Sequence, residues 1–322
     1  MSKLISIRRR AILRPASQGC RFPPFVSPDS SPSLVTIVMS NRCRVLRTAL
    51  ASIALLIIVG KPDSARAQDL AKLYVPYLAQ PPVIDGDLAE WKDFAFNDGV
   101  WDINRLRHAS WYDEGRRNRL TDHDDEPRPE DDLRARYYIS WDDHNLYLGA
   151  EVVDNVNDVD DPAPADRRWY YKDSICWFIE APRDDAPEWF GQGDNAFCFV
   201  IDEDRPSYAT WWRHGAPGQT YIEEPIPSEA VDYSIQFDPW GTGPADFVLE
   251  ARVAMAATFP KSDPRWRPPQ VGDEYSLNIV HCDPDGGDYG GHFMVYGDGD
   301  DDATWSRLIL VGPQEPIERL PE

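Results

Sequence analysis

Short segments rich in apolar and aromatic residues, separated by polar turns, constrain the fold of this chain more than any other feature. The two clearest segments cover residues 134–141 and 146–153, and the turn Asp142-Asp143-His144-Asn145 separates them. Paired segments of this kind are typical of a β-hairpin. Similar segments follow at residues 174–180, 196–202, 208–213, 231–237, 247–253, 275–281, 292–296 and 307–311. This spacing predicts an all-β fold, a two-sheet antiparallel β-sandwich of the immunoglobulin or jelly-roll kind.

The other segments offer little helix. Residues 73–77 are expected to form an edge strand, because Pro76 has no backbone N–H to donate to a ladder. We expect a turn and one helical turn at residues 84–91, and helical character elsewhere only at 255–258. Residues 97–132 are rich in Arg, Asp and Pro without clear periodicity, which indicates a long loop.

A targeting signal lies inside the chain rather than at its start. Basic residues at 42–47 precede an apolar run at 49–59, and Ala-Arg-Ala follows at 65–67. The apolar run is shorter than the roughly 20 residues that span a bilayer. This order is that of a secretory signal peptide cleaved near Ala67, which predicts a secreted or periplasmic protein. A retained signal anchor is the alternative.

The signal divides the chain into three parts. Met39 stands just upstream of the basic cluster, so residues 39–67 are predicted to be the signal peptide. Residues 1–38 are then either a non-native extension or a disordered leader. Residues 68–322 form a single predicted domain, which we expect to be monomeric.

The chain is strongly acidic, with 55 Asp and Glu against 33 Lys and Arg and a formal charge of −22. Only two of the acidic residues but eleven of the basic ones precede residue 68, so the predicted domain carries a formal charge of −31. Such a charge repels phosphate backbones. It therefore excludes nucleic acid as a partner and argues against an anionic membrane surface.

Three acidic stretches suggest a bound cation. They lie at residues 154–161, 283–288 and 298–302, and they offer the oxygen ligands that calcium prefers. Asp154, Asp158 and Asp160 are the candidate ligands, although none of the stretches has the spacing of an EF-hand. The alternative is a set of solvated acidic loops.

Three cysteines follow the signal: Cys176, Cys198 and Cys282. In segments 174–180 and 196–202 the odd-numbered residues are the more apolar and should face the core, so Cys176 and Cys198 should point the other way. If the two strands are antiparallel neighbours, a register centred on Pro187 sets these cysteines opposite each other, within reach of a disulfide. Cys282 would then remain a free thiol. Two buried cysteines that never bond are the alternative.

Four short motifs occur in order along the predicted domain. They are Pro82-Val83-Ile84-Asp85-Gly86-Asp87-Leu88-Ala89-Glu90-Trp91; the hairpin at 139–148 with Val153-Asp154 after it; Trp169 followed by Asp173-Ser174-Ile175; and the segments 250–253 and 272–279. Together they resemble the motifs of carbohydrate-binding module family nine. The resemblance implies a two-sheet antiparallel sandwich that binds oligo- or polysaccharide through aromatic rings, holds structural calcium and performs no catalysis.

The resemblance also implies which side chains contact the sugar. Trp169 takes the place of one stacking tryptophan, and Asp173 begins the strand after it with one extra residue in between. Tyr296 or Trp305 stands in for the second stacking tryptophan. Ordinary packing of these aromatic residues in the core is the alternative.

Further sugar contacts are expected on the strand at 208–213 and at His214, which follows it. Adjacent residues on a strand point to opposite faces, so one of Trp211 and Trp212 packs in the core and the other, Trp212, can face the ligand. Arg213 and His214 could donate hydrogen bonds to sugar hydroxyls. Half-exposed packing is the alternative.

The resemblance bears on the two cysteines as well. At the positions of Cys176 and Cys198 the family usually carries Glu and often carries Arg, and that polar pair faces the sugar. Replacing the pair with cysteines implies that a different sugar is bound or that the site is altered.

Two other classes of function remain open. A glycosidase needs two carboxylates about 5–9 Å apart, but so many acidic residues make such a pair uninformative, and no hydrolase or phosphate-loop motif occurs. A haem or redox domain on the same fold needs axial His or Met ligands. Its candidates are Met255, Met294, His281 and His292, and their spacing does not require a haem.

Overall fold

The computed structural model describes residues 70–102, 105–108, 133–156, 169–184, 186, 190–202, 206–215, 221–283, 292–299 and 301–313. The predicted signal peptide, residues 1–38 and the candidate calcium ligands Asp158 and Asp160 lie outside these ranges. No helix within them has the length and apolarity that a membrane span requires.

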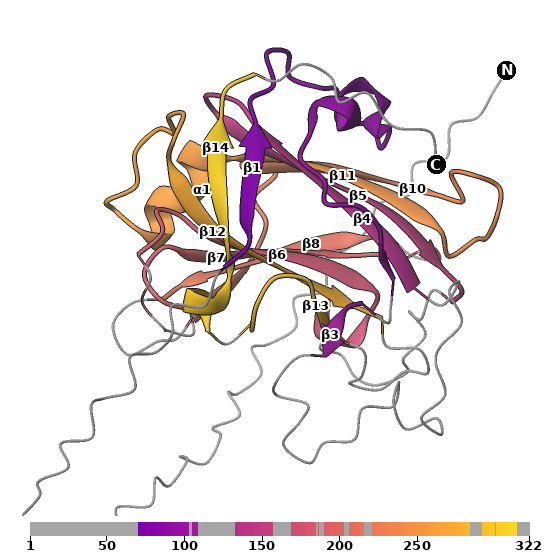
Figure 1. The fold of residues 1–322 in the computed structure, drawn as a ribbon. Coiled ribbons are helices and arrows are strands. Elements are labelled where there is room, and N and C mark those ends of the chain that lie inside the picture. Colours follow the sequence, from indigo (N-terminus) through magenta and orange to yellow (C-terminus); the bar gives the residue numbers. More distant parts are fainter. Residues whose placement is uncertain are drawn as a thin grey trace, which may run out of the picture. The chain divides into compact units, whose positions relative to one another are not determined.

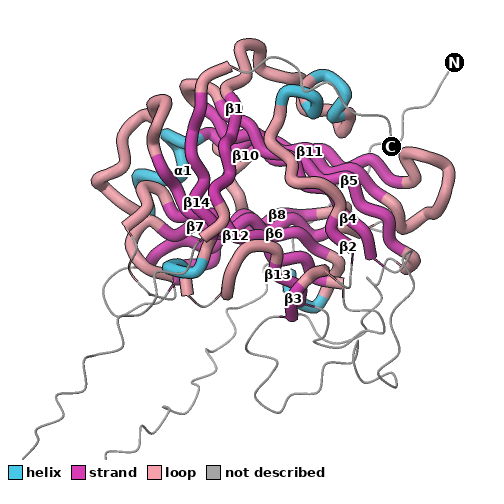
Figure 2. Tube along the Cα trace, viewed as in Figure 1, coloured by secondary structure: helices cyan, strands magenta, loops and turns pink. Residues whose placement is uncertain are grey.

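The described strands form two sheets that pack as layers of a β-sandwich (Figures 1 and 2). The first has nine strands. Its main order is β1 (Lys72–Pro76), β14 (Ser306–Val311), β12 (Glu274–Cys282), β6 (Ser174–Glu180), β7 (Asp194–Val200), β8 (Tyr208–His214) and β9 (Tyr221–Pro225); β13 (His292–Met294) also pairs with β12, and β3 (Arg107–His108) with β13. The second consists of β10 (Val231–Phe237), β11 (Phe247–Ala254), β5 (Asn145–Asp154), β4 (Leu133–Trp141) and β2 (Trp101–Asp102).

The sequence pattern predicted most of these elements. The two-sheet sandwich is confirmed, and the ladders between its named strands are antiparallel except for the β1–β14 pair, which is parallel. The segment 221–225 was not predicted as a strand, because only two of its five residues are apolar; it pairs with β8 at the sheet edge. Two short strands, β2 and β3, lie within the expected loop 97–132.

Helices are short, and most connect strands. The α-helix α1 (Met255–Ser262) is longer than predicted and includes Pro260. The 3₁₀ turns are η1 (Leu88–Glu90), η2 (Lys92–Phe94), η4 (Trp169–Tyr171) and η5 (Asp302–Thr304). Asp87 caps η1 by accepting a hydrogen bond from the Ala89 N–H, which explains the helical turn that the sequence predicted here.

The main hydrophobic core lies between the two sheets. Alternate residues of each strand contribute to it, because successive side chains of a strand point to opposite faces. From the nine-stranded sheet these include Ile175, Trp177, Ile179, Phe197, Phe199 and Trp211, and from the five-stranded sheet Tyr137, Ile139, Leu148, Ala150, Phe247 and Leu249. The odd-numbered stripes of β6 and β7 therefore face the core, as their apolar character predicted.

A second apolar layer covers part of the outer face of the five-stranded sheet. Leu88 and Trp91 pack there against Tyr138 and Tyr147. Gly149 makes this contact possible, because a Cβ atom at that position would lie 3.0 Å from Leu88 Cδ2 and 3.2 Å from Trp91 Cη2. The segment that opens the domain is thus part of the fold rather than a free leader.

The buried carboxylate of Glu250 anchors this segment. It accepts hydrogen bonds from Trp91 Nε1 at 2.8 Å and from the backbone N–H groups of Asp85 and Gly86 at 2.9 Å. Burial raises the pKa of Glu250, while these three donors lower it. The donors come from a turn about 160 residues earlier in the chain, so this one side chain joins the opening motif to β11.

We expect Glu250→Ala to lower the free energy of unfolding by about 3 kcal/mol, because it leaves three donors of a covered turn without their acceptor. Urea denaturation measures the change. Glu90→Ala is the matched control: the Glu90 carboxylate accepts a single exposed hydrogen bond, from the Val83 N–H, and its loss should cost about 0.5 kcal/mol. Equal losses in the two variants would contradict this account of the anchor.

Candidate functional site

The outer face of the nine-stranded sheet is set by the pairing of β6 with β7. Their register places Cys176 opposite Cys198, Phe178 opposite Ala196, and Glu180 opposite Asp194. All six residues belong to the even-numbered stripes, which point away from the main core. This face therefore carries sulfur, aromatic and carboxyl groups in succession.

A disulfide lies at the centre of this face. Cys176 and Cys198 are bonded, with their Cα atoms 4.0 Å apart. Cys282 is a buried free thiol, and burial raises its pKa. The sequence predicted both the pairing and the leftover thiol, because the register centred on Pro187 is the one that β6 and β7 adopt.

Aromatic rings surround the disulfide. We call this group the outer aromatic cluster, and its buried members are Trp169, Phe178, Phe190, Trp212 and Trp305. Three half-buried rings, Tyr170, Tyr208 and Tyr221, pack against it. The outer face of an antiparallel sheet is usually polar when it is solvated. Here the outer face is apolar along most of β6, β7 and β8. It therefore differs from the polar face that a solvent-exposed sheet usually presents.

The rings of the cluster pack edge to face or tilted, except for one stacked pair. The Tyr221 ring lies flat on the Trp212 ring, at 4.2 Å between centroids and 13° between planes. Trp169 meets Trp212 edge-on at 5.5 Å. Trp169 is 3% exposed and Trp212 is 7% exposed, so neither offers a broad open surface, whereas Tyr221 above Trp212 is half-buried. Of these three rings, Tyr221 is therefore the one that is partly open to solvent.

Two of the predicted sugar contacts lie outside this cluster. Tyr296 belongs to the core between the sheets and meets Trp101 edge-on at 5.7 Å. Arg213 lies on the same side of β8 as Trp211, because residues two apart share a face, and its guanidinium donates to Glu224 at 2.7 Å. The prediction grouped Arg213 with Trp212, but strand alternation separates them. His214 Nδ1 lies 2.8 Å from the Phe190 carbonyl oxygen.

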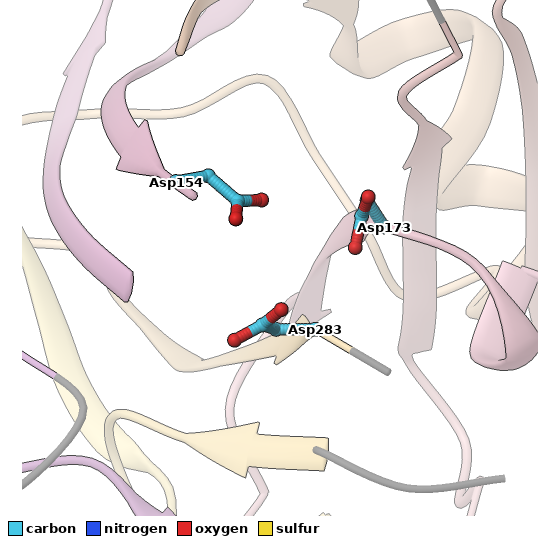
Figure 3. A group of neighbouring side chains, drawn as sticks. All are labelled: Asp154, Asp173 and Asp283. Carbon is cyan, nitrogen blue, oxygen red and sulfur yellow. The ribbon is translucent and has the colours of Figure 1, made fainter. Parts of the chain in front are cut away.

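Three buried aspartates meet at one end of the sandwich, where the two sheets face each other. They are Asp154 at the end of β5, Asp173 just before β6, and Asp283 just after β12, and one carboxylate oxygen from each lies within 4.8 Å of the others. Figure 3 shows the three carboxylates directed toward a common space. The sequence predicted Asp154 as a metal ligand but assigned Asp173 to the sugar. The structure brings both together, with ligands from both sheets.

This triad has the chemistry of a hard-cation site. Three like charges this close repel one another unless protons or a cation neutralise them. The donor atoms are all carboxylate oxygens, which suit calcium or magnesium rather than zinc. Sequence reasoning included Asp283 only as part of an acidic stretch, because its two partners lie more than 100 residues away and are brought near by the sandwich.

A second acidic group lies at the other end of β6. Glu180 and Asp194 face each other across the β6–β7 ladder, and both are fully buried. Glu180 accepts hydrogen bonds from the Asp184 N–H, at 2.6 Å, and from the Ser276 hydroxyl. Neither carboxylate oxygen of Asp194 has a hydrogen-bond partner in the described part of the chain. Sequence reasoning missed this pair, although both residues lie on the strands that carry the cysteines. Glu180 is the last residue of β6 and Asp194 is the first residue of β7.

Burial makes these two carboxyl groups weak acids. It raises the pKa of Glu180 to about 8, with the charge of Asp184 adding to the effect and the Ser276 hydrogen bond opposing it. Burial also raises the pKa of Asp194 well above its ordinary value, as do the nearby charges of Asp302 and Glu180. Glu180 is therefore largely protonated at neutral pH. Along β6, the outer face thus carries the aromatic cluster and then a largely protonated carboxyl group.

Comparison with known proteins gives structural but not sequence matches. No family model matches the sequence, and no curated protein matches it. The structure is similar to a carbohydrate-binding module family 9 (CBM9) from Caldicellulosiruptor kristjanssonii in complex with cellotriose, at 15% identity and TM-score 0.46 over 78% of this chain and 98% of that one. It is also similar to a family 9 module from the same organism in complex with glucose, at 16% identity and TM-score 0.48 over 77% of this chain and all of that one.

The raised pKa of Glu180 predicts a pH dependence of stability. The folded protein keeps a proton on Glu180 up to about pH 8, whereas the unfolded chain releases it near pH 4.5. The folded state therefore binds more protons between these values, so this contribution is full below about pH 4.5 and is lost as pH rises toward 8. Glu180→Gln cannot ionise, and its amide can still accept from Asp184 and donate to Ser276. Unfolding free energies at pH 5 to 8 should fall less steeply in this variant.

The difference between the two proteins reports the ionisation of Glu180, together with the effect of the Glu180 charge on the pKa of Asp194. Burial lowers the pKa of His281 to about 3 and that of His292 to about 4, and both histidines contribute equally to wild type and variant. Glu229→Gln, at an exposed position, is the control and should follow the wild-type slope. Parallel pH profiles for wild type and Glu180→Gln would show that Glu180 ionises normally in the folded protein.

Proposed function

We propose that the domain binds carbohydrate without catalysis, on the outer face of the nine-stranded sheet. The observation that carries this proposal is the Tyr221 ring, which lies flat on Trp212 and is itself half-buried. A sugar ring presents an apolar C–H face, and a fixed aromatic ring stacks against it at low entropic cost. The Trp212 ring beneath Tyr221 holds that surface in place.

The polar groups near this surface suit sugar hydroxyls. Hydroxyl groups both donate and accept hydrogen bonds, so a binding site needs both kinds of partner. The half-buried Tyr170, Tyr208 and His214 lie around the same cluster and supply such groups. The two cysteines of the disulfide occupy positions where carbohydrate-binding module family nine usually carries Glu and often carries Arg. We therefore expect this domain to prefer a different sugar from that family, or to bind sugar more weakly.

We expect Tyr221→Ala to lower the affinity for the bound saccharide by roughly 1–3 kcal/mol, about 5- to 150-fold, through the loss of the stacking ring. Isothermal titration of the full chain with the saccharide selected from a glycan array, with cellotriose and glucose in the panel, measures this. Tyr74→Ala is the matched control, because Tyr74 is exposed on β1, away from the cluster. Binding of no glycan, or an unchanged affinity in Tyr221→Ala, would overturn the proposal.

The aspartate triad is proposed to bind calcium. Asp154, Asp173 and Asp283 offer up to six carboxylate oxygens, and calcium takes roughly six to eight oxygen ligands from flexible geometry. Because Asp154 ends a strand of one sheet and the other two flank strands of the second, the ion would hold the two sheets together at this end. Its role is structural, since it supports the start of β6 and the adjacent Trp169.

We expect calcium to raise the melting temperature. A ligand that binds only the folded state at 100 times its dissociation constant stabilises it by about 2.7 kcal/mol, which corresponds to roughly 5–10 °C for a domain of this size. Calorimetry in chelator and in millimolar calcium tests this, with Asp283→Asn as the variant and Asp143→Asn, at an exposed turn, as the control. The same melting temperature in both buffers would show that the folded protein does not bind calcium at this site.

The two rival classes receive less support from the residues they require. The candidate haem ligands are all buried and engaged: His281 Nδ1 lies 2.7 Å from the Tyr137 hydroxyl, His292 Nε2 lies 2.6 Å from the Tyr170 carbonyl oxygen, and Met294 Sδ accepts from the Gly299 N–H. Met255 belongs to the main core. A glycosidase pair must reach its substrate, whereas Glu180 and Asp194 are fully buried.

Export of the domain remains part of the proposal. The predicted signal peptide at 39–67 carries it, and the Cys176–Cys198 disulfide is the kind of bond that persists in an oxidising compartment. Mass spectrometry of the exported protein would find its N-terminus near Gln68 if cleavage follows Ala67.

A further inference from the structure

The five-stranded sheet also has an outer face, and only part of it is covered. The segment that contains Leu88 and Trp91 packs over Tyr138 and Tyr147. Farther along the same face lies a cleft of about 600 Å³, which we call the Trp240 cleft. The residues that matter for its chemistry are Arg134 and Arg136 of β4, Glu151 and Val153 of β5, and Trp240 and Thr242 of the β10–β11 loop. Its volume is in the range of small-molecule sites.

Trp240 gives the cleft an open aromatic wall. It is 44% exposed, and no other tryptophan in the described ranges is classed as exposed. Trp240 and Val153 line the same concave surface, and within the described ranges no ring contact of Trp240 is found. Such a wall is the usual way to hold the apolar face of a ring-shaped ligand.

The loop that carries Trp240 is held in one conformation. The Asp238 N–H donates to the Asp246 carbonyl oxygen at 2.8 Å, and the Asp246 N–H donates to the Gly243 carbonyl oxygen at 3.2 Å. The buried Asp246 carboxylate accepts from the Thr242 hydroxyl and, at 3.1 Å, from the Asp154 N–H. A ligand that stacks on Trp240 therefore need not order the loop, which limits the entropic cost of binding.

The floor of the cleft is basic in an otherwise acidic chain. Arg134 and Arg136 are two residues apart on β4, so both project onto this face about 7 Å apart along the strand. Glu151 lies opposite Arg136, and its carboxylate accepts hydrogen bonds from Lys92 and from the Tyr138 hydroxyl, both at 2.6 Å. Although burial raises the pKa of Glu151, these donors lower it below its ordinary value.

The local charge balance favours an anion. Asp102 is the partner of Arg134 across the β2–β4 ladder. Among the residues that line the cleft, the guanidinium groups of Arg134 and Arg136 stand against the single carboxylate of Glu151, which also pairs with Lys92. The charge of the whole chain opposes an anion, but salt screens exposed charges beyond about 8–10 Å, so the nearby guanidinium groups dominate at contact. Their planar forks match a carboxylate better than a lone hydroxyl.

We infer that the Trp240 cleft is a second saccharide site and that it takes an acidic sugar, a uronic acid unit within an oligosaccharide. The sugar ring stacks on Trp240, and its carboxylate pairs with Arg134 and Arg136. The Glu151 carboxylate and the Thr242 hydroxyl oxygen, whose proton is donated to Asp246, accept hydrogen bonds from its hydroxyls. This site lies on the opposite sheet from Tyr221 and uses guanidinium groups, where the other face carries carboxyl groups, so its ligand differs in chemistry as well as in place.

Titration of the full chain with oligomers of galacturonate, glucuronate and mannuronate tests the inference, at a fixed free calcium concentration because uronates themselves bind calcium. The methyl esters of the same oligomers are the matched ligands, since they differ only in charge. At least one acidic oligomer should bind and change the tryptophan fluorescence, and its methyl ester should bind at least tenfold more weakly.

The variants separate the two sites. Trp240→Ala and Arg134→Gln, at exposed positions that should not disturb folding, are each expected to weaken uronate binding about tenfold or more, with unchanged melting temperatures. Tyr221→Ala should leave uronate binding unchanged, even if it abolishes binding of a neutral glycan. Absence of binding to every acidic oligomer would overturn the inference, as would equal affinity for the methyl esters. So would uronate binding that Tyr221→Ala removes and Trp240→Ala does not.

Discussion

The register of β6 against β7 is the constraint on which the candidate site depends. It puts one stripe of each strand into the main core and sets Cys176 opposite Cys198 on the other face. A slip of one strand by a single residue would turn its core residues outward. Glu180 and its neighbours would then enter the space between the sheets. The disulfide joins the two strands at the centre of the ladder and opposes such a slip. It therefore stabilises the register that both the main core and the outer aromatic cluster require.

Buried carboxyl groups recur in this acidic protein, and each is accommodated by different chemistry. Glu250 is surrounded by three N–H donors from the opening motif. Glu180 lies in a site where burial raises its pKa, so a proton neutralises it. The aspartate triad gathers three carboxylates at one point, in an arrangement that could hold a cation. An isolated buried carboxylate costs several kcal/mol, so these arrangements explain how so acidic a chain builds a large core.

The two outer faces of the sandwich differ because different segments cover them. The opening motif covers part of the outer face of the five-stranded sheet and leaves the Trp240 cleft on the same face. Aromatic side chains of the sheet itself, with Phe190 and Trp169 from its connections, cover the nine-stranded sheet. One face therefore offers guanidinium groups around an exposed ring, and the other offers hydroxyl and carboxyl groups around a packed cluster. A sandwich of this kind can present two binding surfaces of unlike charge.

The sequence by itself indicated most of the strands, their inward and outward stripes and the disulfide, because these follow from the alternation of apolar and polar residues along neighbouring strands. It also indicated Asp154 as a cation ligand. Only the tertiary structure decided which distant residues meet. It moved Asp173 from the sugar site to a triad with Asp283, separated Tyr296 and Arg213 from Trp212, and left Trp240 exposed beside Arg134. These outcomes depend on how two sheets and their covering segments pack, and local periodicity carries no information about contacts between residues a hundred positions apart.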